Sequence, residues 1–212
     1  MLIKYFKILI YIIITVRVFS ANAGSFDDFF IAIRNDNVGN LNELLSRGFD
    51  PNTRNEKGQP GLVVAMQEHS LKAARALLAL PAVEVDALNQ AGESALMIAA
   101  LKGDLEGMQL LLTRGAKVNQ LGWSALHYAA TGPETKAVQL LLDKGAAIEA
   151  ASPNGSTPLM MAAQYGSEGS VKLLLARGAD PKRRNQLNLS AADFARRAGR
   201  ESLAKQLEQA VR

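Results

Sequence analysis

A helix-start pattern recurs along this 212-residue chain at a nearly constant interval. Each copy runs from a Gly through an apolar stretch, and the clearest copies are Gly92–Ala100, Gly122–Ala130, Gly155–Ala163 and, more weakly, Gly58–Met66. The next Gly or Pro that closes a Leu-rich or Ala-rich run always comes 19 residues after an apolar start residue: Leu62 to Pro81, Leu96 to Gly115, Leu126 to Gly145, Leu159 to Gly178, and Phe29 to Gly48 at the front. A fixed period of about 33 residues indicates a stacked repeat array.

Local signals of helix ends surround each copy. Ser94, Ser124 and Thr157 stand directly before apolar runs, where a hydroxyl accepts a free backbone amide. Pro158 falls at a first helical position, where a missing N–H costs nothing. Closing glycines such as Gly115 suit left-handed helix caps. The sequence therefore predicts pairs of short helices whose apolar faces are buried only by stacking.

These residues closely resemble the ankyrin repeat, whose pattern is G-x-T-P-L-H-x-A-A followed by a helix ending L-L-L-x-x-G-A. The Gly122–Ala130 copy keeps the His, and the Gly155–Ala163 copy keeps the Thr-Pro. The second ending occurs at Leu110–Ala116, Leu140–Ala146 and Leu173–Ala179, whereas Met97 and Met160 replace the His and Gly61, Ala95 and Ala125 replace the Pro. The resemblance covers nearly everything after Ser25 and implies an all-α solenoid of helix–turn–helix units joined by β-hairpin fingers.

The spacing divides residues 24–212 into five units and a cap. We expect units at about 26–52, 53–86, 87–119, 120–150 and 151–183, with a helical pair at 184–212 as the C-terminal cap. The first unit begins with phenylalanines instead of the family start, so it should be atypical. The joint from Gly115 to Leu126 spans 11 residues, against 14 or 15 elsewhere. The finger entering the fourth unit is therefore three residues short, and its helices keep their length.

Residues 1–23 read as a secretory signal peptide. Lys4 and Lys7 precede the apolar run Ile8–Val16, and Ala21-Asn22-Ala23 supplies a small-x-small cleavage pattern. A nine-residue helix reaches about 14 Å, against a hydrocarbon core of about 30 Å, so an uncleaved anchor is the less favoured alternative. We expect no stable membrane insertion after cleavage.

Charge does not indicate nucleic-acid binding. Cleavage would remove three of the 24 basic residues and leave 21 against 20 acidic ones. Residues 181–212 nevertheless hold eight Lys or Arg and three Asp or Glu. This basic end is either a solvated terminal cap, which repeat arrays need for solubility, or a surface for an acidic partner or membrane headgroups.

Nothing in the sequence favours catalysis. The chain has two histidines and no cysteine, and no His/Cys cluster has metal-ligand spacing. His127 stands at the family's structural His position, where the resemblance implies that the imidazole ties helix starts together, and His69 reads as a surface residue. We therefore expect no enzyme, no metal and no cofactor.

The prediction is a non-catalytic protein–protein interaction module that acts as a monomer. Absence of cysteine with a short signal favours the periplasm of a Gram-negative bacterium. A secreted effector that binds a host protein is the alternative. The partner's identity stays open among an oxidant-defence enzyme, a cell-wall enzyme and a folding client, because fold alone does not give function.

The resemblance also implies where a partner binds. In ankyrin-like stacks the finger tips and the exposed side of each first helix line one concave face. The positions that map there are Ile98, Leu101, Trp123, Tyr128, Thr131, Met161 and Gln164. Trp and Tyr are enriched among residues that dominate binding energy. A stripe at helical spacing is also typical of packing between repeats, so binding and packing both remain open.

Overall fold

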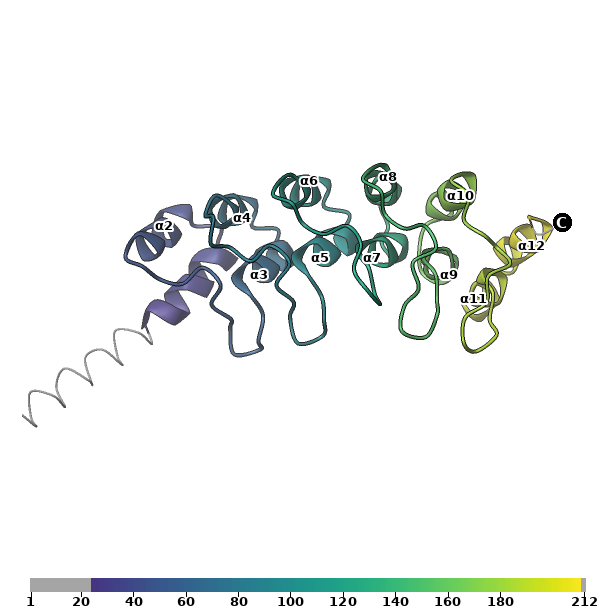
Figure 1. Ribbon diagram of the computed structural model, residues 1–212, viewed down its shortest axis with the longest axis horizontal. Helices are drawn as coiled ribbons and strands as arrows, with labels where there is room; N and C mark the ends of the chain where they lie inside the picture. The colour runs from purple at the N-terminus through teal and green to yellow at the C-terminus, as the bar shows by residue number, and fades with distance from the viewer. Residues whose placement is uncertain (1–23, 211–212) are drawn as a thin grey trace, which may run out of the picture.

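The computed structural model describes residues 24–210, which form one row of antiparallel helix pairs (Figure 1). The predicted signal peptide lies outside the described residues. The pairs, first helix before second, are 24–34 with α2 (Val38–Ser46), α3 (Gly61–Glu68) with α4 (Leu71–Leu78), α5 (Ala95–Lys102) with α6 (Leu105–Thr113), α7 (Ala125–Thr131) with α8 (Thr135–Asp143), α9 (Pro158–Gln164) with α10 (Glu168–Ala176), and α11 (Ala191–Arg197) with α12 (Glu201–Gln209). The predicted all-α solenoid is confirmed.

The pairs are arranged in two layers. First helices α3, α5, α7, α9 and α11 pack in sequence against one another, and second helices α2, α4, α6, α8 and α10 form the other layer. The row is arched, and the loops that precede the first helices project as fingers on the inner side of the arch (Figure 1). We call the surface formed by the first helices and the fingers the concave face.

Small residues set the spacing between first helices. The paired alanines at Ala99-Ala100, Ala129-Ala130 and Ala162-Ala163 are all fully buried. After them comes Gly166, where an added Cβ would lie 2.0 Å from the carbonyl oxygen of Ala130. Second helices contribute larger side chains to the core, among them Leu111, whose exposed fraction is zero. The core therefore runs along the stack between the two layers.

Two methionines cap their own helices where the repeat pattern has histidine. The Ser94 hydroxyl accepts the Met97 amide at 3.3 Å, and the Met97 sulfur accepts the Ser94 amide at 3.5 Å. Thr157 and Met160 make the same pair of contacts at 3.4 Å each, with Pro158 at the first helical position. A thioether is a weak acceptor, so these boxes bond more weakly than their oxygen and nitrogen counterparts.

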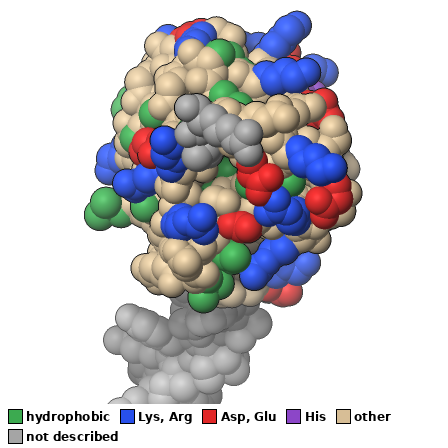
Figure 2. All heavy atoms as spheres, turned by 90° about the vertical axis from the view of Figure 1, so that its right-hand side faces the viewer, with side chains coloured by type: hydrophobic (Ala, Val, Ile, Leu, Met, Phe, Trp, Pro, Cys, Tyr) green, Lys and Arg blue, Asp and Glu red, His purple; other side chains and the backbone are tan. Residues whose placement is uncertain are grey.

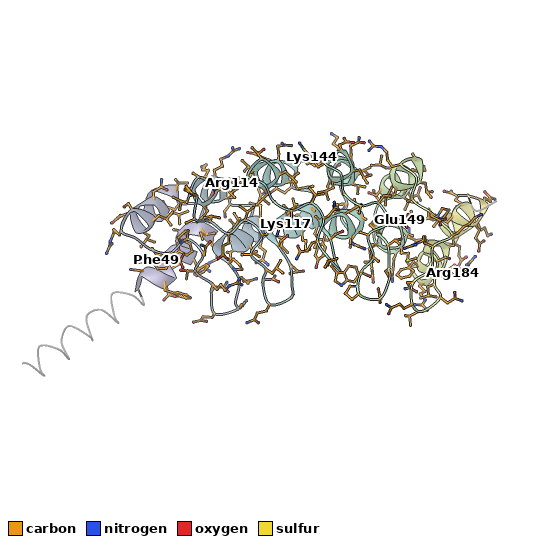
Figure 3. All side chains as sticks on the ribbon, in the orientation of Figure 1. Phe49, Arg114, Lys117, Lys144, Glu149 and Arg184 are labelled. Atoms are coloured by element: carbon orange, nitrogen blue, oxygen red, sulfur yellow. The ribbon has the colours of Figure 1, made fainter. Side chains whose placement is uncertain are left out.

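In the first four joints one side chain accepts a backbone amide from the following repeat. The acceptor–donor pairs are Asn52 with Glu84 at 2.9 Å, Asp86 with Lys117 at 2.9 Å, Asn119 with Ala147 at 2.8 Å and Glu149 with Asp180 at 2.8 Å. Figure 3 shows the joints that carry Lys117 and Glu149 beyond the second-helix ends marked by Arg114 and Lys144. We call Asn52, Asp86, Asn119 and Glu149 the joint acceptors.

The fingers are tight turns, and the residues described contain no β-strand beyond an isolated bridge between Arg54 and Pro60. Four fingers are closed by a bond from one amide to the carbonyl four residues later. These turn anchors are Asn55, Asn89, Ser152 and Asn185, with bonds of 2.9–3.0 Å. Each anchor's side-chain oxygen also accepts an amide of its own turn. The implied β-hairpins are therefore reduced to turns, because the side chain closes each finger before a ladder can extend.

Aromatic rings close the N-terminal end of the stack. The ring centroid of Phe29 lies 5.1 Å from that of Phe30 and 4.8 Å from that of Phe49, and Phe26 lies 5.3 Å from Phe30. Phe29 and Phe30 are buried. This cluster gives the first pair an apolar interior without the small-residue start found in later repeats.

Candidate functional site

A hollow of about 230 Å³ lies on the concave face between α5, α7 and α9. Its lining residues come from three successive repeats: Leu101, Trp123, His127, Tyr128, Thr131 and Met161. Five of the seven predicted binding residues are thus brought together. We call this set the inner hollow.

The other two predicted residues do not line it. Ile98 is only 7% exposed and belongs to the core, which favours packing, the alternative left open for this residue. Gln164, at the end of α9, is half-buried and outside the hollow. An exposed stripe at these first-helix positions is therefore interrupted at α5, because Ile98 is covered by the neighbouring repeats.

His127 forms the floor of the hollow and holds two repeats together. Its Nε2 lies 3.0 Å from the carbonyl oxygen of Ser156, which can only accept, so Nε2 donates. Nδ1 then accepts the Ser124 amide at 3.2 Å and lies 2.9 Å from the Ser124 hydroxyl. Burial lowers the pKa of His127, outweighing the hydrogen bond to Ser156 that favours the charged form. The imidazole thus links the helix starts of two repeats, and its burial favours the neutral form.

Tyr128 is anchored to the preceding finger. Its hydroxyl donates to Glu93 Oε1 at 3.1 Å, and the Asn89 side chain donates to Glu93 Oε2 at 2.7 Å. Burial, followed by the Glu93 charge and the hydrogen bond to it, raises the pKa of Tyr128 to about 12. The Tyr128 hydroxyl is therefore bonded within the protein, and the Tyr128 ring lines the hollow.

The short finger leaves apolar side chains uncovered beside the hollow. Asn119 keeps the position of a joint acceptor, and the three missing residues remove the turn anchor that would follow it. Among residues 24–210 no backbone bond closes this finger. Leu121 at its tip is fully exposed, and Trp123 is 36% exposed with its ring 5.3 Å from that of His127, edge-on.

Sequence reasoning missed Leu121 and Glu93. The signal for Leu121 was an apolar residue at the tip of a shortened finger, where turn residues are usually polar. Glu93 carries no comparable signal, because its role depends on a tyrosine 35 positions later in the chain.

His69 lies on the surface, as expected, and also makes a contact that the sequence did not predict. It ends α3 with a left-handed φ of 57°, and its Nδ1 lies 3.0 Å from Asp104 Oδ2. Asp104 Oδ1 accepts the Gly107 amide at 2.9 Å and so begins α6. This pair links the two repeats, and neither residue lines the inner hollow.

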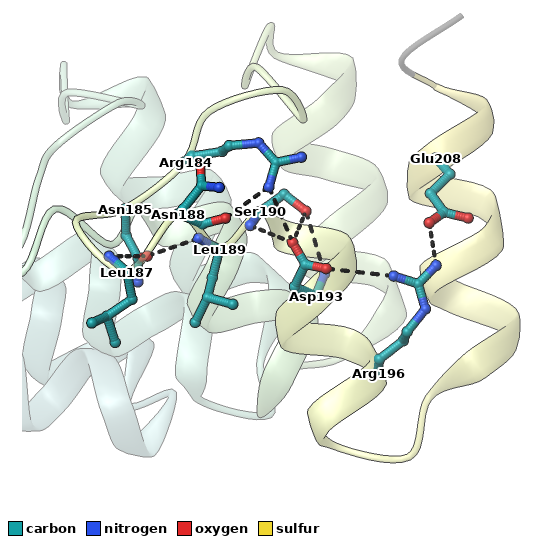
Figure 4. Close-up of polar contacts among 9 residues, drawn as sticks. All are labelled: Arg184, Asn185, Leu187, Asn188, Leu189, Ser190, Asp193, Arg196 and Glu208. Carbon is teal, nitrogen blue, oxygen red and sulfur yellow. Dashed lines mark hydrogen bonds and ion pairs between the residues drawn. The ribbon is translucent and has the colours of Figure 1, made fainter.

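Part of the basic C-terminal end is paired internally. Arg184 and Arg196 each lie 3.5 Å from Asp193, and Arg196 also contacts Glu208 of α12 (Figure 4). Hydrogen bonds from the Ser190 amide and hydroxyl, with a smaller contribution from the two arginines, hold the pKa of Asp193 below its ordinary value. Basic and acidic side chains alternate over this end of the stack (Figure 2). These pairs fit the terminal-cap interpretation better than an open basic surface.

Within residues 24–210, no cluster of three or more His, Cys, Asp or Glu residues is arranged to hold a metal ion. No helix in that range combines the length and apolar character needed to span a bilayer.

The helices come in pairs, glycines with positive φ follow many of them, and the pairs stack in two layers. These features define a helical repeat protein. Models of "Ankyrin repeats (3 copies)" match residues 29–121 and 117–185, and the chain belongs to the ankyrin-repeat family. Ankyrin repeats are protein–protein interaction modules, and this chain is one.

The chain is also similar to individual proteins. An 86-residue stretch is 31% identical to the human "Transient receptor potential cation channel subfamily A member 1", covering 41% of this chain and 8% of the channel. A chain of the solved structure "Bd0816 Predatory Endopeptidase from Bdellovibrio bacteriovorus in complex with immunity protein Bd3460" superposes with a TM-score of 0.74 at 26% identity. That match covers 86% of this chain and 97% of the other.

Proposed function

We propose that this protein is a non-catalytic binding module, exported to the periplasm of a Gram-negative bacterium, that acts as a monomer and holds one protein partner against its concave face. The observation that carries the proposal is the inner hollow, where apolar side chains of three repeats meet at the short finger, which also carries the exposed Leu121. Helices α5, α7 and α9 of the concave face carry a single Lys or Arg, Lys102, so neither nucleic acid nor a membrane is the expected partner.

The partner class we favour is an exported endopeptidase that the module inhibits. Support comes from the similarity to a chain in a complex of an endopeptidase with an immunity protein. It also comes from the signal-like residues 1–23. The sequence left open an oxidant-defence enzyme, a cell-wall enzyme and a folding client, and this similarity favours an enzyme that cleaves peptide bonds.

Photo-cross-linking in the native organism tests the binding face. A photoreactive amino acid at Leu121 should capture one protein, whereas the same group at Lys172, exposed on α10 of the outer layer, should not. Capture from Lys172 alone would contradict binding on the concave face. If the captured protein is a peptidase, adding purified module should reduce its activity in proportion to the complex formed. A captured protein without peptidase activity would remove the inhibitor role and keep the binding module.

Localisation is tested separately. Residues 1–23 fused to an alkaline phosphatase that is active only outside the cytoplasm should give activity, and a fusion beginning at residue 24 should not. Fractionation then distinguishes the two destinations. Retention in the periplasm supports the proposal, and recovery from the medium or host cells supports the secreted effector.

A further inference from the structure

The inner hollow has the dimensions of a side-chain pocket. Its volume of about 230 Å³ is below the roughly 300–1,000 Å³ of pockets that hold drug-sized molecules. The lining comes from three helices and one finger, so a segment lying along the concave face would pass over it. A protein segment that inserts one side chain fits this space better than a free cofactor.

Most polar atoms of the lining already have partners inside the protein. Both ring nitrogens of His127 are bonded to Ser124 and Ser156. The Tyr128 hydroxyl donates to Glu93, and the Thr131 hydroxyl donates to the His127 carbonyl at 2.9 Å. A polar or charged group entering the hollow would lose water without gaining these hydrogen bonds, which carries a free-energy cost.

Trp123 is the exception in the lining. Its indole N–H has no partner among the described residues, and its side chain lies at the rim, one-third exposed. A backbone carbonyl beside the inserted side chain is a suitable acceptor there. The rim therefore offers one donor, and the interior offers apolar surface.

The surrounding helices are almost without charge. Helices α5, α7 and α9 carry a single charged residue, Lys102, whose ammonium donates to the Gln67 carbonyl oxygen. The nearest carboxylate in contact with the lining, Glu93, is held by Tyr128 and Asn89. No side chain here is placed to neutralise a charge on the partner.

We infer that the inner hollow is a specificity pocket for one uncharged apolar side chain, of the size of Leu, Met or Phe, on an extended segment of the protein partner. This inference rests on the proposed function and adds the chemistry of the partner residue. The opening left by the short finger gives the segment access, and Leu121 and Trp123 contact it at the rim. Lys, Arg, Asp and Glu are excluded from the pocket position.

Selection from a random peptide library displayed on phage tests the pocket. The purified chain from residue 24 onward should select peptides that share one apolar position. Binding is followed by fluorescence of Trp123, the chain's only tryptophan. Replacing the shared apolar residue by Lys or Glu should weaken binding at least tenfold. Recovery of charged residues at that position, or of no shared position, would overturn the inference.

Filling variants connect the selection to the hollow. Leu101→Phe and, independently, Thr131→Leu place extra volume in it from two different helices, so one informative variant remains if the other fails to fold. Each should weaken the selected peptides at least tenfold. The matched control Gln109→Phe adds an aromatic ring to the exposed side of α6 in the outer layer and should change binding less than twofold.

The same variants separate this inference from the proposed function. If filled variants still yield the native partner from the Leu121 cross-linker with undiminished affinity, the pocket is wrong and the binding module stands. If the wild-type chain captures no partner while peptides still depend on the hollow, the pocket stands and the proposed function is wrong.

Discussion

The guanidinium of Arg200 donates to the carbonyl oxygen of Gly166 at 2.9 Å. The same nitrogen lies 3.0 and 3.1 Å from the carbonyl oxygens of Ala163 and Ala162. A side chain just before α12 thus caps the C-terminal end of α9, where carbonyls lack partners within their own helix. These hydrogen bonds from the Arg200 guanidinium connect the last helix pair to the preceding repeat.

Replacing Arg200 by Ala should therefore destabilise the protein by about 1.5–3 kcal/mol, the range for hydrogen bonds to charged groups. Urea denaturation measures the change. Arg197→Ala is the control, because Arg197 is exposed and no contact of its side chain is seen in the described chain; its effect should stay within about 0.5 kcal/mol. Equal effects of the two substitutions would show that the carbonyl cap contributes nothing.

His127→Met tests the imidazole bridge between repeats. Methionine already occupies the corresponding positions 97 and 160, where the sulfur accepts its own cap amide. The variant should keep the helix start and lose the bond to Ser156, at a cost of about 1 kcal/mol. A loss above about 3 kcal/mol in thermal or urea unfolding would mean that the ring is also needed for packing.

The same residue should make stability pH-dependent. Because burial lowers the pKa of His127 in the folded state, the unfolded chain binds a proton first as pH falls below the ordinary value of 6.5. Stability should therefore decrease on acidification from pH 7 toward the folded pKa and be fully present above 6.5. His127→Met should flatten this part of the curve. An unchanged slope would assign it to other groups.

At alkaline pH, Tyr128 should make stability decrease as pH rises, the opposite direction to His127. Its folded pKa of about 12 lies above the ordinary value of 10.0, so its contribution to stability is present below pH 10 and is lost as pH rises toward 12. Absorbance of tyrosinate near 295 nm should show one late-titrating phenol that disappears in Tyr128→Phe. If the late step remains in the variant, it belongs to another tyrosine.

Trp123 separates binding from folding. Trp123→Ala should lower partner affinity by about 2 kcal/mol or more and change the melting temperature little, because the ring stands at the rim. Adding Tyr128→Ala also removes the bond to Glu93, so the single variant is the cleaner test. Leu111→Ala is the structural comparison and should cost about 2–5 kcal/mol from the fully buried site. An early melt of Trp123→Ala would make the indole a packing residue.

The repeat period was sufficient to predict the stacked helix pairs, because most pairs are marked by a capping residue, a Leu-rich run and a closing Gly. The role of His127 was also predictable, since its position in the repeat has one local environment. The role of Ile98 was not. Its exposure depends on how closely the neighbouring repeats approach, and a periodic pattern does not contain that distance.

Side-chain contacts between repeats were equally invisible in the sequence. The Tyr128–Glu93 bond joins residues in different repeats, and neither residue belongs to the repeat pattern. The ion pairs of the basic end were also not predictable from the sequence, because Asp193 contacts Arg184 from a different element of the fold. Composition indicated a positively charged end, and the structure shows which of its charges have acidic partners.

The three-residue deletion in the finger that enters the fourth unit has a consequence for how such a protein diversifies. Asn119 still reaches the Ala147 amide at 2.8 Å, so the deletion leaves the neighbouring layers in register. The length of a finger can therefore change without disturbing the packed helices. An insertion or deletion of a few residues at a finger tip can open or cover a recognition surface, and no compensating substitution in the core is needed.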